Sequence, residues 1–177
     1  MWSRMRMPAV VFALATLESL AAHVYNEPEQ ALAEEFPECT IRREAHYLSR
    51  EQASALQEQL SADPGRFHTF YVAERAGQVI GYGIFDTHRV RTKNETLLVT
   101  LMPDGALRRI TMISFFEPED YLAPQRWLDL FSGRGREDAL RPGVDLPIMS
   151  GATLTSQAVA ASARRAIALH RVYFSGP

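Results

Sequence analysis

The spacing of hydrophobic residues along the chain changes near residue 67. Before that point, apolar positions at helical spacing predict a helix opened by Glu27-Pro28-Glu29 and stopped by Pro37, and a second from the N-cap Ser49 to the Asp63-Pro64-Gly65 turn. The segment 39–48 between them is predicted to be a strand. From residue 67 onward, four runs rich in aromatic and β-branched residues predict an antiparallel meander, at 67–73, 78–85, 96–102 and 107–116.

Two features of the meander carry further structural information. Pro103-Asp104-Gly105 separates the last two runs and is typical of a hairpin turn. Gly81 and Gly83 lie inside the second run, where glycine weakens a strand unless another group approaches the backbone closely. That group is a ligand or a large neighbouring side chain, and the pattern slightly favours the side chain.

The C-terminal part returns to helical spacing. A short helix is expected at about 124–131, two loops follow at 132–136 and 141–147, and the last helix is expected from about Ser156 to Arg171. The order of elements predicts an α+β fold, with an antiparallel sheet of about four or five strands and helices packed on it.

Composition narrows the function classes. The chain has 177 residues, which favours one domain. Its formal net charge of −2 and the lack of a basic stripe argue against a nucleic-acid partner. Cys39 is the only cysteine, so no internal disulfide and no Cys-x-x-Cys metal motif exist. The histidines show no metal-ligand spacing, and no metal site is predicted.

The first 22 residues resemble an export signal. Arg4 and Arg6 precede an uncharged run from Met7 to Leu17, and Ser19-Leu20-Ala21 provides small residues for cleavage. Residues 1–22 are therefore predicted to be a signal peptide or an N-terminal anchor, and the protein is expected in the periplasm or cell envelope. A buried amphipathic first helix is the alternative.

The segment from Ser150 to Ser156, Ser-Gly-Ala-Thr-Leu-Thr-Ser, is the most informative motif. Gly151 permits a tight bend, and Thr155 or Ser156 is a natural N-cap for the last helix. The start of a helix presents free N–H donors and the positive end of its dipole, which together favour an anion. A capping turn without any ligand explains the same residues.

This motif, followed by an Ala-rich helix, resembles the flavinylation motif of the FMN-binding domain family, which includes subunits of the sodium-pumping NADH:quinone oxidoreductase and of the Rnf complex. The resemblance covers about 67–169, and 27–54 resembles the leader section of stand-alone members. It implies a division into 1–22, 23–66 and 67–177, the last being the FMN-binding domain. It also implies FMN joined to Thr153 by a phosphoester, installed by a periplasmic flavin transferase from FAD.

The sequence departs from the family pattern at one position. The family usually carries Asp three residues before the Ser/Thr of the motif, and this chain has Pro147 there, with Asp145 two residues earlier. Either Asp145 replaces that carboxylate through a bulged loop, or recognition by the transferase is impaired and FMN binds without a covalent bond or not at all.

The expected cofactor-binding residues fall into two groups. The attachment turn supplies Ser150, Gly151, Ala152, Thr153, Leu154 and Thr155. Ring or phosphate contacts are expected from Glu117, Tyr121, Trp127 and His88, with Phe115, Phe116, Arg89 and Arg91 as further candidates. Core packing explains Phe115, Phe116 and Trp127 equally well, and a solvated strand end explains His88 and the arginines.

The function implied by the resemblance is electron transfer rather than independent catalysis, so no catalytic residue is assigned. The chain has no Gly-rich loop for NADH, because Gly81-x-Gly83 lacks the third glycine and the following helix. Electrons would therefore come from a membrane redox partner or a cytochrome. The alternatives are a secreted cofactor-free module that binds a small ligand or a protein, and a hydrolase using Ser150 or Ser156, although no Gly-x-Ser-x-Gly elbow is present.

Overall fold

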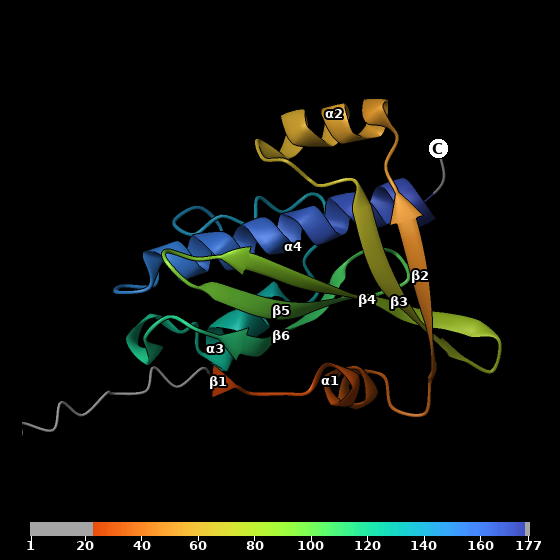
Figure 1. Ribbon diagram of the computed structural model, residues 1–177, viewed down its shortest axis with the longest axis horizontal. Helices are drawn as coiled ribbons and strands as arrows, with labels where there is room; N and C mark the ends of the chain where they lie inside the picture. Colours follow the sequence, from red (N-terminus) through yellow and green to blue (C-terminus); the bar gives the residue numbers. More distant parts are fainter. Residues whose placement is uncertain (1–22, 176–177) are drawn as a thin grey trace, which may run out of the picture.

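A computed structural model describes residues 23–175 and shows a single antiparallel sheet flanked by helices (Figure 1). The order across the sheet is β1-β6-β5-β4-β3-β2. The strands are β1 (His23–Val24), β2 (Thr40–Tyr47), β3 (Phe67–Arg75), β4 (Gln78–Arg89), β5 (Asn94–Leu101) and β6 (Leu107–Phe115). The predicted α+β fold is confirmed, and the four predicted meander runs are β3 to β6. The two-residue β1 pairs with β6 as an additional edge strand.

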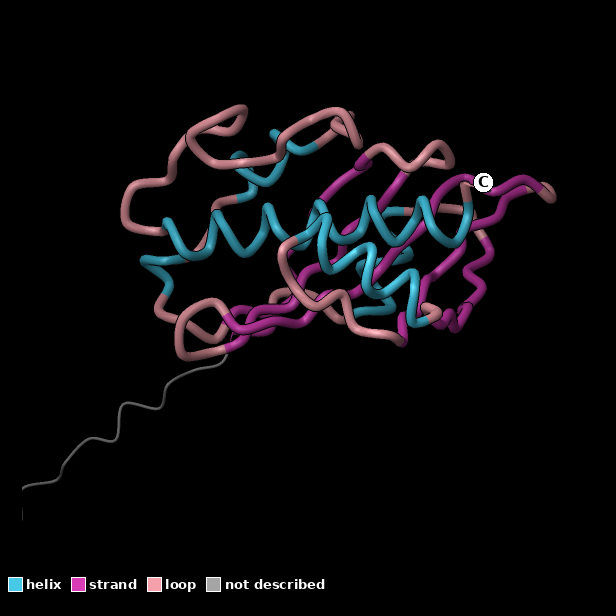
Figure 2. Tube along the Cα trace, turned by 90° about the horizontal axis from the view of Figure 1, so that it is seen from above, coloured by secondary structure: helices cyan, strands magenta, loops and turns pink. Residues whose placement is uncertain are grey.

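Helices cover both faces of the sheet. They are α1 (Pro28–Glu35), α2 (Arg50–Leu60), α3 (Gln125–Leu128) and α4 (Thr153–Phe174), with short 3-10 turns η1 (Glu119–Tyr121) and η2 (Asp129–Phe131). Figure 1 shows α1 on one side of the sheet and α4 with α2 on the other, and Figure 2 shows α4 running across the strands. The expected helix at 124–131 is therefore α3 continued by η2.

The alternation of side chains along β5 explains this two-sided burial. Leu97 and Val99 are fully buried in the core cluster that includes α4. Leu98 lies between them in sequence, points to the opposite face and joins the smaller cluster with Leu32 and Phe36 of the α1 region. A central strand that is buried on both faces has a continuous run of apolar residues, and β5 has such a run.

The two glycines of β4 permit the close approach of α1. A Cβ on Gly81 would lie 2.5 Å from the Leu101 carbonyl oxygen and 2.8 Å from Cε1 of Phe36. A Cβ on Gly83 would lie 3.0 Å from Cδ2 of Leu32. Neighbouring side chains, together with the adjacent strand, therefore occupy the space, and the favoured interpretation of these glycines is confirmed.

The two long helices on the α4 face begin differently. Ser49 caps α2 with a full capping box, because its hydroxyl accepts from the Gln52 N–H at 3.1 Å and the Gln52 side chain accepts from the Ser49 N–H at 2.9 Å. The predicted cap of α4 at Thr155 or Ser156 is wrong. The helix starts at Thr153, and its N-cap is Ala152, which has no side-chain acceptor.

The earlier start of α4 has a local cause. The Ser156 N–H donates to the Ala152 carbonyl at 3.0 Å, which closes the first helical turn upstream of both hydroxyls. The Ser156 hydroxyl then bonds back to the Thr153 carbonyl at 2.9 Å, and the Thr155 hydroxyl donates to the Tyr121 carbonyl at 2.7 Å. Both side chains are buried, and their hydroxyls donate to carbonyls instead of capping the helix.

The predicted signal peptide or anchor at 1–22 lies outside the described residues. Within 23–175, no helix is long and apolar enough to cross a membrane.

Candidate functional site

The Ser150–Thr153 turn presents an exposed hydroxyl at the first residue of α4. Gly151 has φ +83°, a left-handed conformation that favours glycine, and the Ala152 N–H closes the turn on the Met149 carbonyl at 3.2 Å. Thr153 and Ser150 are exposed. In the described part of the chain, the Thr153 hydroxyl makes no hydrogen bond, so it is free to react or to bind.

The backbone at this helix start is also open. The first N–H groups of an α-helix have no acceptor within the helix, and the Ala152 side chain offers none. The positive end of the dipole of a 22-residue helix lies at the same point. The arrangement is a potential anion site with a free hydroxyl beside it.

A pocket of about 190 Å³ borders this turn. Four segments distant in sequence meet there: the β4–β5 turn, the end of β6, η1 and the start of α4. Its lining comprises Val90, Arg91, Glu117, Tyr121, Gly151, Ala152, Thr153, Leu154 and Thr155. Most of the site residues expected from the sequence are thus brought together, and Ser150 stands next to the pocket in the same turn.

Glu117 holds the β4–β5 turn in place. Its carboxylate accepts from the backbone N–H groups of Arg91, Thr92 and Lys93, at 3.1 Å for Arg91 and 2.7 Å for Lys93. Burial raises the pKa of Glu117, but the hydrogen bonds from these backbone donors together lower it by a larger amount. The pKa therefore lies below its ordinary value. The carboxylate is ionised at neutral pH and fills a nest of donors that would otherwise suit an external anion.

Tyr121 and Trp127 border the attachment turn in different ways. Tyr121 is half-buried and lines the pocket, and its carbonyl ties η1 to Thr155 of α4. Trp127 is buried, and its ring packs edge-on against Phe131 in the core. Its indole N–H donates to the Pro147 carbonyl at 3.1 Å, so Trp127 anchors the loop that leads into the turn and is not among the residues lining the pocket.

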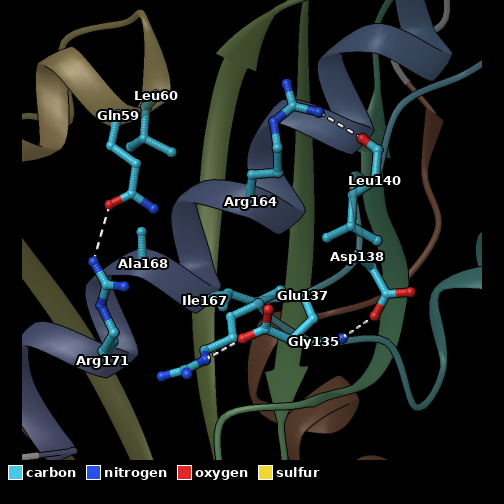
Figure 3. Close-up of a pocket in the computed structure, with 11 residues that line it drawn as sticks. Gln59, Leu60, Gly135, Glu137, Asp138, Leu140, Arg164, Ile167, Ala168 and Arg171 are labelled. Carbon is cyan, nitrogen blue, oxygen red and sulfur yellow. Dashed lines mark hydrogen bonds and ion pairs between the residues drawn. The ribbon is translucent and has the colours of Figure 1, made fainter. Parts of the chain in front are cut away.

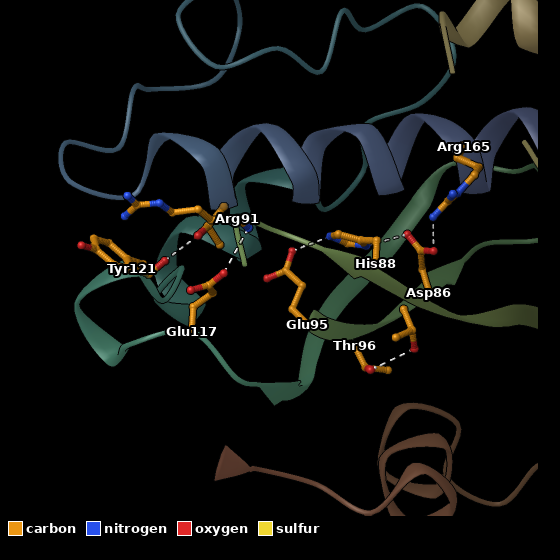
Figure 4. Close-up of polar contacts among 10 residues, drawn as sticks. Asp86, His88, Arg91, Glu95, Thr96, Glu117, Tyr121 and Arg165 are labelled. Carbon is orange, nitrogen blue, oxygen red and sulfur yellow. Dashed lines mark hydrogen bonds and ion pairs between the residues drawn. The ribbon is translucent and has the colours of Figure 1, made fainter. Parts of the chain in front are cut away.

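His88 does not line the pocket but belongs to a buried polar network beside it (Figure 4). Its Nε2 lies 2.6 Å from Glu95 Oε1, and its Nδ1 lies 3.2 Å from Asp86 Oδ2. Arg165 of α4 forms an ion pair with Asp86 on the other side. Figure 4 shows the chain Arg165–Asp86–His88–Glu95 leading along the sheet toward Glu117.

The electrostatics of this network are tightly coupled. Burial lowers the pKa of His88, but hydrogen bonds and charges from Asp86 and Glu95 outweigh it and raise the pKa to about 9. Burial also raises the pKa of Asp86, yet bonds from His88 and Arg165 hold it well below its ordinary value. Glu95 is fully buried, and burial raises its pKa against the opposing effect of His88. Its Oε2 has no hydrogen-bond partner among the described residues.

Sequence reasoning missed Asp86 and Glu95 as partners of His88, and Arg165 as a partner of Asp86. Glu95 stands two residues before Leu97 on the face that packs on α4, and Asp86 stands two residues after Ile84 on the same face. A charged residue in the period-2 pattern of a buried face is the signal that could have found them, because such a residue needs a partner. Of the two phenylalanines considered as ring contacts, Phe115 is buried in the core and Phe116 is exposed.

Asp145 does not lie near Thr153 in the pocket lining. Its carboxylate accepts from the backbone N–H groups of Leu140 and Arg141 at 2.9 and 2.7 Å, and from the Arg134 guanidinium at 3.0 Å. These bonds close the 140–146 loop on itself. The idea that Asp145 replaces the missing carboxylate of the motif therefore gains no support from its position.

The chain matches no protein-family model, no curated protein and no solved structure in comparisons with known proteins. The resemblance to the FMN-binding domain family thus stays a prediction from the motif. Among residues 23–175, no group of three or more His, Cys, Asp or Glu side chains could hold a metal ion.

Proposed function

We propose that this protein is an FMN-binding flavoprotein of the cell envelope, with the cofactor joined to Thr153 by a phosphoester, and that it serves electron transfer. One observation supports this most directly. Thr153 is exposed with a free hydroxyl, at an uncapped helix start, beside a pocket lined by Glu117, Tyr121 and Arg91.

The bonding of the pocket favours the start of α4 for a phosphate. Two sets of backbone donors border the pocket, but Glu117 already fills the one at residues 91–93. Only the donors at the start of α4 remain open. The exposed Arg91 side chain lines the same pocket and would offset the charge of a phosphate there.

The size of the pocket constrains how the rest of the cofactor would lie. Pockets that enclose a whole drug-sized ligand have volumes of about 300–1,000 Å³, and this one measures about 190 Å³. It would hold only part of the nucleotide. Leu154 is 49% exposed and Phe116 is 37% exposed, and with Tyr121 they offer apolar surface for the remainder.

When bound, FMN would supply the redox chemistry, and the residues of this chain would bind and orient it. In the proposal, a periplasmic flavin transferase attaches the cofactor, and a membrane redox partner or cytochrome exchanges electrons with it. Attachment would proceed without the motif carboxylate. Pro147 stands at that position and contributes only its carbonyl, which accepts a hydrogen bond from the Trp127 indole N–H. The hydrolase alternative has little support, because among the described residues no histidine lines the pocket and the carboxylate there, Glu117, is held by backbone N–H groups.

The proposal is tested by co-expressing the full chain with a periplasmic flavin transferase and recording the visible spectrum before and after acid precipitation. We expect a flavin spectrum that stays with the denatured chain. If acid releases the yellow colour, FMN is bound without a covalent bond, and Thr153 is only a contact of its phosphate. A colourless chain, with or without the transferase, would contradict the proposal and favour the secreted cofactor-free binding module.

A further inference from the structure

A second cavity lies on α4, away from the Thr153 pocket. It has a volume of about 310 Å³ and is enclosed by the end of α2, the loop at 135–140 and the C-terminal half of α4 (Figure 3). It is lined by Gln59, Leu60, Gly135, Arg136, Glu137, Asp138, Leu140, Arg164, Ile167, Ala168 and Arg171. The two cavities have no lining residue in common.

Part of the charge around this cavity is balanced within the chain. Arg136 pairs with its neighbour Glu137 at 2.6 Å. Asp138 accepts from the Gly135 N–H at 2.8 Å and lies 3.6 Å from the Arg134 guanidinium. Arg136, Glu137 and Asp138 together bring a formal charge of −1 to the lining, and Asp138 shares Arg134 with Asp145.

Arg164 and Arg171 are different, because their partners are neutral. Arg164 Nη1 donates to the Leu140 carbonyl at 2.5 Å, and Arg171 Nη2 donates to the Gln59 side-chain oxygen at 3.0 Å. Figure 3 shows the two arginines on opposite sides of the cavity. Neither has a carboxylate within 4.0 Å in residues 23–175.

The surroundings of Arg164 make its charge costly. Its side chain is half-buried, and burial, followed by the charge of Arg141, lowers its pKa, while the charge of Asp145 opposes this. A guanidinium remains charged at neutral pH even so. A partly desolvated cation without a counter-ion is a site whose free energy an anion would lower.

Apart from Gln59 and Gly135, the remaining lining is apolar. It consists of Leu60 of α2, Leu140 of the 135–140 loop, and Ile167 and Ala168 of α4. Ligand pockets in general combine an apolar wall with a few placed polar groups, and a volume of about 300 Å³ is the lower end of their range. This cavity has the required volume and an apolar part, although polar groups supply the larger share of its lining. A site for a bare hydrated ion would not need the apolar part.

We propose that this cavity binds a small organic anion, one with an apolar body and a carboxylate or phosphoryl head, through Arg164 and Arg171. Arg164 is the principal contact because it is half-buried and faces only a carbonyl. Arg171 is exposed and reinforces it from the far side. The site is independent of the flavin proposal, since it shares no residue with it.

Isothermal titration calorimetry on the full chain, in phosphate-free buffer at low ionic strength, tests this proposal with phenyl phosphate, benzoate and benzyl alcohol. We expect saturable binding of at least one of the two anions and none of the neutral alcohol. The better anion identifies the head group. Affinity should fall at least tenfold in Arg164→Met and about threefold in Arg171→Met, since methionine keeps an apolar side chain but removes the charge.

Two controls keep the test decisive. Arg75→Met removes an equal charge from an exposed position on β3 and should leave the affinity unchanged. If Arg164→Met fails to fold, Arg164→Lys keeps the charge and loses the planar fork, and it should still weaken binding. No saturable binding, equal binding of the alcohol, or full affinity in the arginine variants would overturn the proposal.

Discussion

The start and the middle of α4 both place polar side chains against the sheet, but they use them in opposite ways. In the middle, Arg165, Asp86, His88 and Glu95 bond to one another, and the network is largely closed. At the start, Thr153 has a free hydroxyl and the helix has no cap. Polar groups satisfied by their neighbours stabilise the fold, whereas groups left open at the surface are available to a ligand.

This contrast separates two residues that the sequence placed in one list. His88 and Thr153 were both expected to contact a cofactor. The structure gives His88 two carboxylate partners and gives Thr153 none. We therefore expect His88 to matter for stability and Thr153 for cofactor attachment, and the predictions below test that division.

The largest expected effect is on the stability of His88→Ala. Removing the imidazole leaves the buried Glu95 without its cation and leaves Asp86 with Arg165 alone, which should cost about 3–5 kcal/mol of unfolding free energy. Thr153→Ala should change it by less than about 0.5 kcal/mol, because an exposed side chain without partners is lost. Urea denaturation measures both. Equal effects of the two substitutions would remove the distinction between the two regions.

The pH dependence of stability follows from the same network. The pKa of His88 is raised from 6.5 to about 9 in the folded protein. Its contribution is therefore fully present below pH 6.5 and is lost as the pH rises through about 9, an effect on the order of 2–3 kcal/mol. Asp86, Glu95 and Arg165 are the charged groups facing it.

Denaturation curves between pH 6 and 10 check this expectation. The slope should be largely absent in His88→Gln, which cannot titrate. A wild-type curve that is flat over this range, or one that matches the variant, would be inconsistent with a protonated His88 between two carboxylates.

Glu117 is expected to have a smaller effect, because it lies at the boundary of the two regions. Glu117→Gln replaces charge-assisted bonds to three backbone N–H groups by weaker neutral ones, at a cost of about 1–3 kcal/mol. It should also free part of the donor nest at 91–93. Chemical denaturation gives the first quantity, and Glu58→Gln, at an exposed position on α2, is the control. A loss no larger than that of the control would mean that the bonds contribute little.

The smallest expected effect is on FMN affinity in Arg91→Met. An exposed cation contributes about 0.5–1 kcal/mol to an anion nearby, so non-covalent FMN binding should weaken about threefold. Arg89→Met is the matched control, because Arg89 carries the same charge on β4 and does not line the pocket. Fluorescence quenching of FMN by chain made without transferase measures the difference. Equal weakening in both variants would argue for a long-range charge effect only.

Much of the fold was predictable because local patterns agree with it. The meander follows from four runs separated by turn residues, and the Ser49 capping box follows from two residues three positions apart. The start of α4 was not predictable in this way. Thr155 and Ser156 look like caps in sequence, but their hydroxyls bond to carbonyls of Tyr121 and Thr153, and the first of these contacts is tertiary.

The site was predictable only in part. Thr153 and its turn form one continuous motif, and the sequence places that motif directly before the last helix, but not Thr153 as the first residue of the helix. The role of Glu117 depends on donors 24 to 26 residues away, so no local pattern could show that its carboxylate is already bound. The network around His88 similarly joins two strands and a helix, because Asp86 lies on β4, Glu95 on β5 and Arg165, the partner of Asp86, on α4.

The location of the flavin on the chain tests the central proposal most directly. Full-length protein co-expressed with a periplasmic flavin transferase is digested, and the peptide containing Ser150 to Thr155 is sequenced by mass spectrometry. Thr153→Ala and Ser150→Ala are treated in parallel. We predict an FMN phosphoester mass on Thr153 that is lost in Thr153→Ala and retained in Ser150→Ala. Modification at another residue, or an unmodified peptide in the wild type, would contradict attachment at Thr153.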